Sequence, residues 1–303
     1  MSQFNHVSDI GQRDIVSSLE DNVKSFLDWS FLQIGAFINV SIPLSNPNIG
    51  YHKLIPISGD PSLTYPRVWQ AARKDWVYET GISYKNISPT SISGIYLNDT
   101  FLSAPSGSGS YSYSLNYPEG RVTFNNNVSA SSKVFMNYSY RLVQIYKSSD
   151  NAWWKEVEKN NYNPSNYLSN DIQLPSIVLQ IVPRSFSIPH ELGNTANILQ
   201  QDMLLHIFSE NSTQRNNLID ILLKQKDNII MLYDINKVIK NNKNSLNFKG
   251  EINTNRLNYN QLINNNGYLL NKCYIINSFL SELESFSSSL HHGIVRWTLE
   301  IFP

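Results

Sequence analysis

The feature that most constrains the fold is an alternation of apolar and polar residues between positions 92 and 146. It runs through "SGIYLNDTFL", "YSYSLNY", "RVTF" and "KVFMNYSYRLVQIY", with Gly-, Pro-, Asn- and Ser-rich breaks between them. A period of two is typical of a β-strand with two different faces, and the breaks are turn-forming. We predict three or four antiparallel strands with one apolar face, which carries Val134, Met136, Tyr138, Tyr140 and Leu142.

A different period precedes this region. Residues 12–33 repeat apolar side chains at helical spacing, through Leu19, Val23 and Phe26 to Phe31. This pattern predicts an amphipathic helix that stops at Gly35 and is followed by a strand in "AFINVSI". Two interpretations remain open: the helix packs on its own domain, or it is an N-terminal arm that docks on a neighbouring subunit.

After position 175 the sequence pattern changes from short alternating segments to longer apolar segments and a helical segment. The order predicted there is strand, strand, helix, strand, polar Asn-rich excursion (240–266) and two strands joined through 287–292, with N-cap chemistry at 211–213. This order predicts an α+β domain whose helix packs on a mixed sheet. The expected domains are an N-terminal helix with an antiparallel β domain (1–150), a linker that begins with a short helix (151–175) and the α+β domain (176–303).

Charge and cysteine content narrow the classes of function. Lys and Arg number 24, Asp and Glu number 24, and the formal net charge is +0. Such a chain is a poor electrostatic partner for nucleic acid or an anionic membrane, and it self-associates at little electrostatic cost. The longest apolar stretch, residues 26–42, is shorter than the roughly 20 residues of a spanning helix, and the first residues do not resemble a secretory signal. We therefore expect a protein made in the cytoplasm.

The motifs of catalysis and cofactor binding are missing from the sequence. The histidines have no metal-ligand spacing, and neither a nucleophile elbow nor a glycine-rich phosphate loop occurs. His206 is expected to be half-buried on a strand, and His291 and His292 to be exposed in a turn. Cys273 is expected to behave as a small hydrophobe. We therefore predict no catalytic, cofactor-binding or metal-binding residues.

Large aromatic side chains offer packing anchors instead. They suit subunit interfaces or cores, and the candidates are Phe26, Phe31, Trp69, Trp76, Tyr138, Tyr140, Trp153 and Trp154. One alternative is a carbohydrate- or receptor-binding face on the hairpin of residues 111–140, because aromatic rings and amides suit polyols. A weaker alternative is a cell-wall hydrolase that uses two carboxylates from the set Asp99, Glu119, Glu156 and Glu158.

Several segments resemble a family of virion proteins of tailed bacteriophages, especially phages of marine and cyanobacterial hosts. They are "LEDNVKSFLDWSFLQIGAFINV", "VWQAARKDWVYETG", "SGIYLND", "YPEGRVTFNNNVSASSKVFMNYSYRLVQIY" and "PHELGNTANILQQDMLLHIFSENSTQRNNLIDILLKQKDNIIMLYDI". The second half is also similar in outline to the small α+β proteins that terminate or join phage tails as rings. The excursion at 240–266 has no obvious counterpart in the family.

This resemblance implies a structural neck, connector or tail-terminator protein without enzymatic activity. Its location would be the virion, and its partners would be further copies in a ring and other virion proteins. DNA would at most pass through the channel without sequence recognition, and no membrane would be involved.

Overall fold

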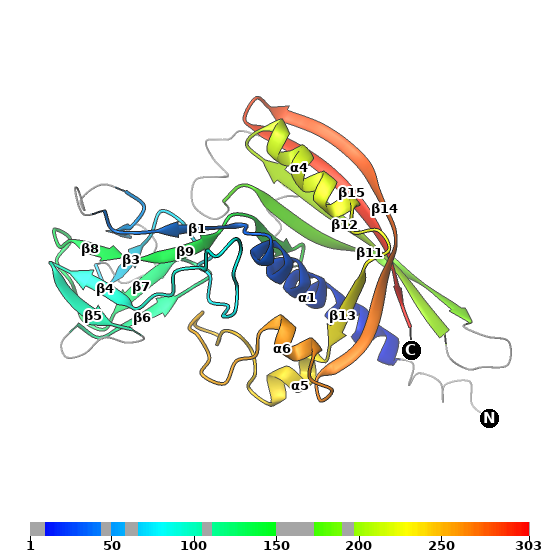
Figure 1. The fold of residues 1–303 in the computed structure, drawn as a ribbon, viewed down its shortest axis with the longest axis horizontal. Coiled ribbons are helices and arrows are strands. Elements are labelled where there is room, and N and C mark those ends of the chain that lie inside the picture. The colour runs from blue at the N-terminus through cyan, green and yellow to red at the C-terminus, as the bar shows by residue number, and fades with distance from the viewer. Residues whose placement is uncertain are drawn as a thin grey trace. The chain divides into compact units, whose positions relative to one another are not determined.

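The computed structural model describes residues 10–43, 50–57, 66–104, 111–149, 173–189 and 197–302. The chain forms two compact units, each built from separate stretches (Figure 1). The helix–sheet unit combines residues 1–30, 143–238 and 259–303, and the β unit combines 31–142 and 239–258. This division differs from the expected boundaries because most of the N-terminal helix belongs with the C-terminal sheet. Most of the expected linker, residues 150–172, lies outside the described residues.

The β unit is built on short antiparallel strands. Seven of them form one sheet in the order β5-β4-β8-β2-β3-β7-β6, and β1 pairs with β9. Their bounds are β1 Phe37–Val40, β2 Lys53–Pro56, β3 Val68–Gln70, β4 Gly94–Leu97, β5 Thr100–Ser103, β6 Tyr113–Asn116, β7 Arg121–Phe124, β8 Val134–Met136 and β9 Tyr138–Arg141. The sheet is larger than the three or four strands predicted, because residues 92–146 supply five of its strands and β2 and β3 insert between β8 and β7. The predicted antiparallel pairing is confirmed.

The seven-stranded sheet curls until its two end strands meet. The Tyr113 hydroxyl on β6 donates to the Leu102 carbonyl on β5, which joins the two end strands of the sheet at 3.0 Å. Every residue of β8 and β9 is buried, including Ser139 and Arg141. The prediction of one polar, solvent-exposed face is therefore wrong for these strands. The predicted single strand is interrupted at Asn137, and other segments cover its second face.

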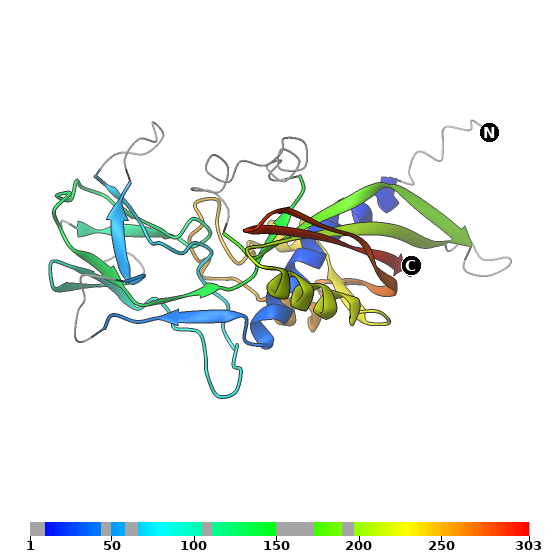
Figure 2. The same cartoon turned by 90° about the horizontal axis from the view of Figure 1, so that it is seen from above.

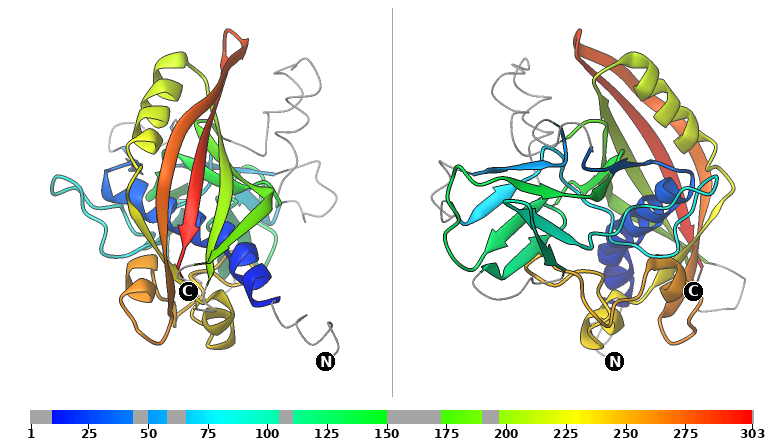
Figure 3. Two further views of the ribbon diagram at one scale, coloured as in Figure 1. Left: turned by 90° about the vertical axis from the view of Figure 1, so that its right-hand side faces the viewer. Right: turned by 60° about the vertical axis from the view of Figure 1, so that its left-hand side comes forward.

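The helix–sheet unit contains a six-stranded mixed sheet in the order β10-β11-β12-β15-β14-β13. Its strands are β10 Gln144–Lys147, β11 Ser176–Pro189, β12 Asn197–Ser209, β13 Ile229–Tyr233, β14 Leu269–Ser287 and β15 Leu290–Ile301. Only the β10–β11 pair is parallel among these. Figure 3 shows β14 and β15 as one long curved hairpin. The α+β class and the predicted order of elements in the second half are confirmed.

Helix α1 (Ile10–Gln33) touches strands from both ends of this sheet. Glu20 accepts hydrogen bonds from the Ile181 amide of β11 and the Ser148 hydroxyl after β10, each at 3.3 Å. The Asn22 side chain accepts from the Tyr233 amide (2.7 Å) and donates to the Tyr233 carbonyl (3.1 Å) on β13. The sheet therefore curves around α1, and Asn22 occupies the outward-facing backbone groups of an end strand. The predicted helix is confirmed, and it packs within its own chain.

Helix α4 (Ser212–Leu223) packs on β12, β15 and β14 (Figure 2). The Asn211 side chain accepts from the Gln214 amide at 2.8 Å, as the predicted N-cap requires. Leu218, Ile219 and Leu222 are buried on one face. The Leu222 carbonyl accepts from the Trp297 indole at 3.2 Å, which fixes the end of the helix on the sheet.

The Asn-rich excursion is more ordered than predicted. Helix α5 (Ile235–Lys240) leads into it, and helix α6 (Tyr259–Ile263) lies within it. Within the β unit, Leu246 and Ile252 form an isolated bridge and pack against the aromatic core. Asparagine side chains form hydrogen bonds to the backbone of turns there, in place of the regular pairing of strands. The segment therefore has no apolar period in its sequence although its backbone is ordered.

Candidate interaction surface

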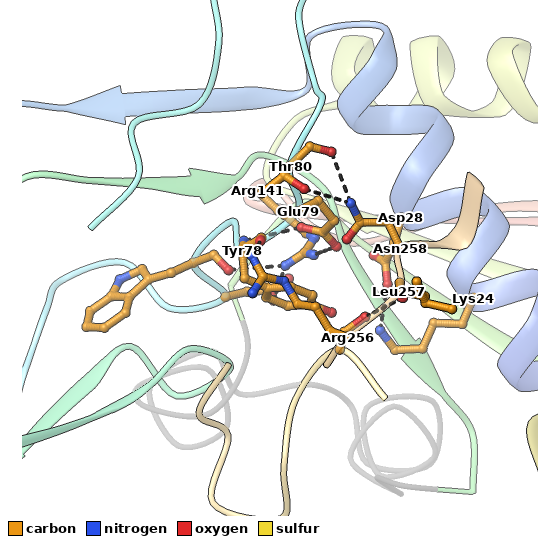
Figure 4. Close-up of polar contacts among 12 residues, drawn as sticks. Lys24, Asp28, Tyr78, Glu79, Thr80, Arg141, Arg256, Leu257 and Asn258 are labelled. Carbon is orange, nitrogen blue, oxygen red and sulfur yellow. Dashed lines mark hydrogen bonds and ion pairs between the residues drawn. The ribbon is translucent and has the colours of Figure 1, made fainter. Parts of the chain in front are cut away.

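The β unit contains a cluster of charged side chains around a buried arginine. Arg141 on β9 is 3% exposed, and its Nη1 lies 2.8 Å from the Asp75 Oδ1. Its Nη2 pairs with Glu79, and its guanidinium lies over the Tyr78 ring at 4.8 Å (Figure 4). Both carboxylates pair with the same buried guanidinium, so neither is an unpaired acid or base in this structure.

The same cluster fastens the excursion to the strands. Arg256 donates to the Tyr78 carbonyl at 3.4 Å. The Asn258 side chain donates to the carbonyl and the hydroxyl of Thr80, at 3.0 and 3.1 Å (Figure 4). Each contact joins sequence-distant backbone within the β unit. The arrangement is that of a structural network rather than a substrate site.

The aromatic residues predicted as interface anchors lie mostly inside the chain. Trp69, Trp76, Tyr138, Tyr140 and Phe31 are each at most 5% exposed. The two indoles are satisfied internally, because Trp69 donates to the Pro66 carbonyl (3.0 Å) and Trp76 to the Arg73 carbonyl (2.9 Å). These five side chains build the chain's own packing and leave almost no surface for a partner.

The remaining anchors differ. Phe26 is partly buried and stacks edge-on against Tyr259, with ring centroids 6.2 Å apart. Trp153 and Trp154 lie outside the described residues. The sequence-based list therefore identifies core residues better than interface residues, because large aromatics suit both environments equally.

Burial also shifts the pKa values of core tyrosines. Desolvation raises the pKa of Tyr113 to about 12, and it raises the pKa of Tyr117 to about 12 against an opposing effect of Arg256. The pKa of Tyr138 is raised for the same reason. These phenols stay neutral hydrogen-bond donors and have no acid–base role near neutral pH.

Metal ligands do not gather in the described part of the chain, where no three His, Cys, Asp or Glu side chains form a group. His206 is 3% exposed, more deeply buried than predicted. The prediction of an exposed His291–His292 turn is wrong for His292, which is 1% exposed on β15. The turn between the last two strands is shorter than expected, so both histidines fall on the strand. Cys273 is fully buried, as expected.

The outer edge of β14 is the most open feature of the helix–sheet unit. β13 covers β14 only as far as Tyr274, and no described strand pairs with the outer side of residues 277–285, which we term the open edge. Residues 279–285 are all exposed, including Phe279, Leu280 and Leu283 at 39–50%. An exposed strand edge with apolar side chains is a template for pairing with another chain.

The open edge has two chemically different sides. Leu280 and Leu283 lie opposite Val295 and Gly293 of β15, on the side where Ile219 of α4 approaches Gly293. Glu282 and Glu284 lie opposite Ile294 and His292, on the other side. The register shifts between Leu280 and Glu282, and this shift places Leu280 and Leu283, which are three residues apart, on the same side of the strand. Sequence periodicity missed this surface because only the pairing shows where β13 ends.

No helix within the described ranges is both long and apolar enough to cross a membrane. No protein-family model matches this chain, and a search of curated proteins finds no significant match.

Proposed function

We propose that this protein is a structural component of a tailed-phage virion, a ring-forming neck, connector or tail-terminating adaptor without catalytic activity. The open edge of β14 is the observation that carries the self-assembly part of this proposal. Contact of that edge with a neighbouring subunit covers the exposed strand and buries Leu280 and Leu283. The zero net charge supports close packing of identical copies.

The phage assignment itself rests on the sequence resemblance. The α+β unit, in which α4 packs on a mixed sheet, is the part of the chain that would serve as the tail-terminator-like domain. Symmetric closure of head-to-tail contacts gives a ring, and a ring at the neck or tail end surrounds the path of the DNA.

The alternative functions lose their supporting residues. Tyr113 and Tyr138, which a sugar-binding hairpin would present, are 3% and 0% exposed. A hydrolase needs two carboxylates across a cleft, whereas Asp99 is exposed in the turn between β4 and β5 and Glu119 lies 3.5 Å from Arg121 and 3.9 Å from Lys74. Glu156 and Glu158 lie outside the described residues.

The decisive experiment combines assembly and location. Mass photometry and negative-stain electron microscopy of the purified full chain are expected to show a closed oligomer. The substitution Leu280→Lys with Leu283→Lys is expected to convert it to monomer by burying charge in the contact. Ile87→Ser is the matched control, because Ile87 is a similarly exposed apolar residue of the β unit (57%). A chain that stays monomeric, and is absent from intact particles by mass spectrometry, overturns the proposal.

A further inference from the structure

Phe248 is the most exposed large apolar residue among the described side chains, at 95%. It lies in the Asn-rich excursion, for which neither the sequence nor the proposed function supplies a role. Single exposed hydrophobes are common on protein surfaces, so exposure alone decides little. The conformation of the surrounding turn gives the exposure its meaning.

The turn that carries Phe248 is held by a dense set of hydrogen bonds. The Asn247 Oδ1 accepts from the amides of Lys249 (2.9 Å) and Glu251 (3.0 Å), and the Asn247 Nδ2 donates to the Glu251 carboxylate (2.7 Å). The Gly250 amide donates to the Asn247 carbonyl at 3.0 Å. Because the backbone is already ordered, docking of Phe248 costs little additional conformational entropy.

The base of the turn is fixed on the β unit. The Tyr117 amide donates to the Gly250 carbonyl at 2.9 Å. Gly250 has φ +76°, and a Cβ there would lie 2.6 Å from the Asn116 Oδ1. A residue with a side chain at position 250 would therefore clash with Asn116, so glycine is needed for the turn to lie against the loop after β6. The result is a rigid projection with an apolar tip.

Lys249 lies beside that tip. Its Nζ is 5.7 Å from the centroid of the Phe248 ring, and the side chain is exposed. We term these two residues the knob. Aromatic residues such as Phe248 are enriched in the buried cores of protein interfaces, whereas a charged residue such as Lys249 suits the polar rim around such a core. The complement of the knob would be an apolar ledge next to an acidic group.

The open edge of β14 has this complementary composition. Leu280 and Leu283 are 43% and 50% exposed, and Glu282 and Glu284 are exposed on the other side of the strand. Residual desolvation and the neighbouring Glu282 carboxylate raise the pKa of Glu284. A cation placed at this edge relieves the repulsion between the two carboxylates.

The same features indicate how two copies meet. Two-fold pairing of the open edge with itself would bring four carboxylates together, two from each copy. Two arginines lie near this edge, but Arg296 pairs with Asp202 and Arg215 donates to the Glu284 carbonyl rather than to a carboxylate. A contact between the knob and the open edge instead joins opposite charges. Because it uses two different patches, it is heterologous and propagates from copy to copy.

We propose that the knob of one copy docks on the open edge of β14 of the next copy, with Phe248 on Leu280 and Leu283 and Lys249 beside Glu282 and Glu284. This inference rests on the proposed self-assembly and specifies the residues that carry it. Phe248 is the hydrophobic anchor, and the charge pair selects the head-to-tail arrangement over the two-fold one.

Cross-linking between differently labelled copies tests the contact directly. Full-length chains that carry the photoreactive analogue p-benzoylphenylalanine at position 248, which keeps an aromatic ring at the tip of the knob, are mixed with 15N-labelled unmodified chains. After irradiation, mass spectrometry is expected to find position 248 joined to residues 277–285 of a chain with the other isotope. An intact assembly in which position 248 joins only other segments, or no segment of another copy, overturns the contact.

Charge reversal tests the polar half. Lys249→Glu is expected to weaken association about tenfold or more, and addition of Glu282→Lys and Glu284→Lys is expected to restore it. Lys226→Glu, at another exposed lysine, is the matched control. Mass photometry of the unmodified chain separates the two possible failures. A monomeric unmodified chain contradicts the proposed function, whereas an assembly that survives both Phe248→Ser and Lys249→Glu contradicts only the knob contact.

Discussion

The imidazole rings of His206 and His292 are stacked, with centroids 5.5 Å apart and planes inclined by 3°. The His206 Nδ1 lies 3.3 Å from the His292 Nε2, and Phe208 and Phe286 stack on His292. Burial lowers the pKa of His206 to about 4, and burial, His206 and Arg215 lower that of His292 to about 3. The pair is therefore neutral in the folded protein near neutral pH.

This pair predicts acid sensitivity. Between about pH 6.5 and pH 4 the unfolded chain binds protons that the folded chain does not, so stability falls as the pH falls, by up to about 1.4 kcal/mol per pH unit for each histidine. Urea unfolding at several pH values measures this slope. The double substitution His206→Gln with His292→Phe is expected to flatten it. An unchanged slope in the double variant contradicts the assignment.

Arg141 predicts a large loss of stability on truncation. Arg141→Met leaves Asp75 and Glu79 without their buried cation, and the expected loss is about 3–5 kcal/mol. Lys237→Met is the control, because Lys237 is 56% exposed and pairs with Asp234 at 3.6 Å. Its expected effect is below about 1 kcal/mol. Equal losses in urea unfolding would contradict a dominant role for the buried cluster.

Gly120 predicts a steric effect beyond its backbone angle. Its φ is +62°, and a Cβ there would lie 2.8 Å from the Arg73 carbonyl oxygen. Gly81 has φ +79° and nothing within 4 Å of such a Cβ. Gly81→Ala is expected to cost about 1 kcal/mol, and Gly120→Ala at least about 1 kcal/mol more. The difference between the two unfolding free energies isolates the clash from the angle, and no difference argues against it.

The Asn22 side-chain amide is expected to stabilise the edge of β13, because it bonds both backbone groups of Tyr233. Asn22→Leu removes both hydrogen bonds to the Tyr233 backbone, and about 1–3 kcal/mol is expected for each buried group left unsatisfied. Asn22→Asp keeps the acceptor but places a carboxylate against the Tyr233 carbonyl, so it is also expected to destabilise. Asn228→Ala is the exposed control. Hydrogen exchange at Tyr233 reports the loss locally, and unchanged protection in Asn22→Leu contradicts the role.

The buried Cys273 thiol is expected to be unreactive in the folded protein. It is 0% exposed, and burial raises its pKa to about 12, so little thiolate is available. Maleimide labelling of the native chain is expected to be negligible and to become complete in urea. Phe248→Cys serves as the reactive control in the same assay. Rapid native labelling of the unmodified chain would show that β14 opens readily.

The sequence predicts much of the local structure, and the reasons are local. Helical spacing and a glycine stop define α1, an Asn N-cap begins α4, and alternation identifies β4 to β7 of the β unit but not β2 and β3. These signals depend on side-chain period and backbone conformation, which neighbouring residues determine. The buried thiol of Cys273 follows from its apolar strand in the same way.

Tertiary structure decided what each element faces. The N-terminal helix joined the C-terminal sheet because Glu20 and Asn22 satisfy backbone and side-chain groups of β11, the segment after β10, and β13. The predicted anchors became core because the curled sheet encloses them, and β14 became an open edge because β13 is short. Such outcomes depend on pairing between distant segments, and no local period encodes which strand lies beside which. The sequence by itself determined the elements and the turns, and long-range pairing determined the surfaces available to a partner.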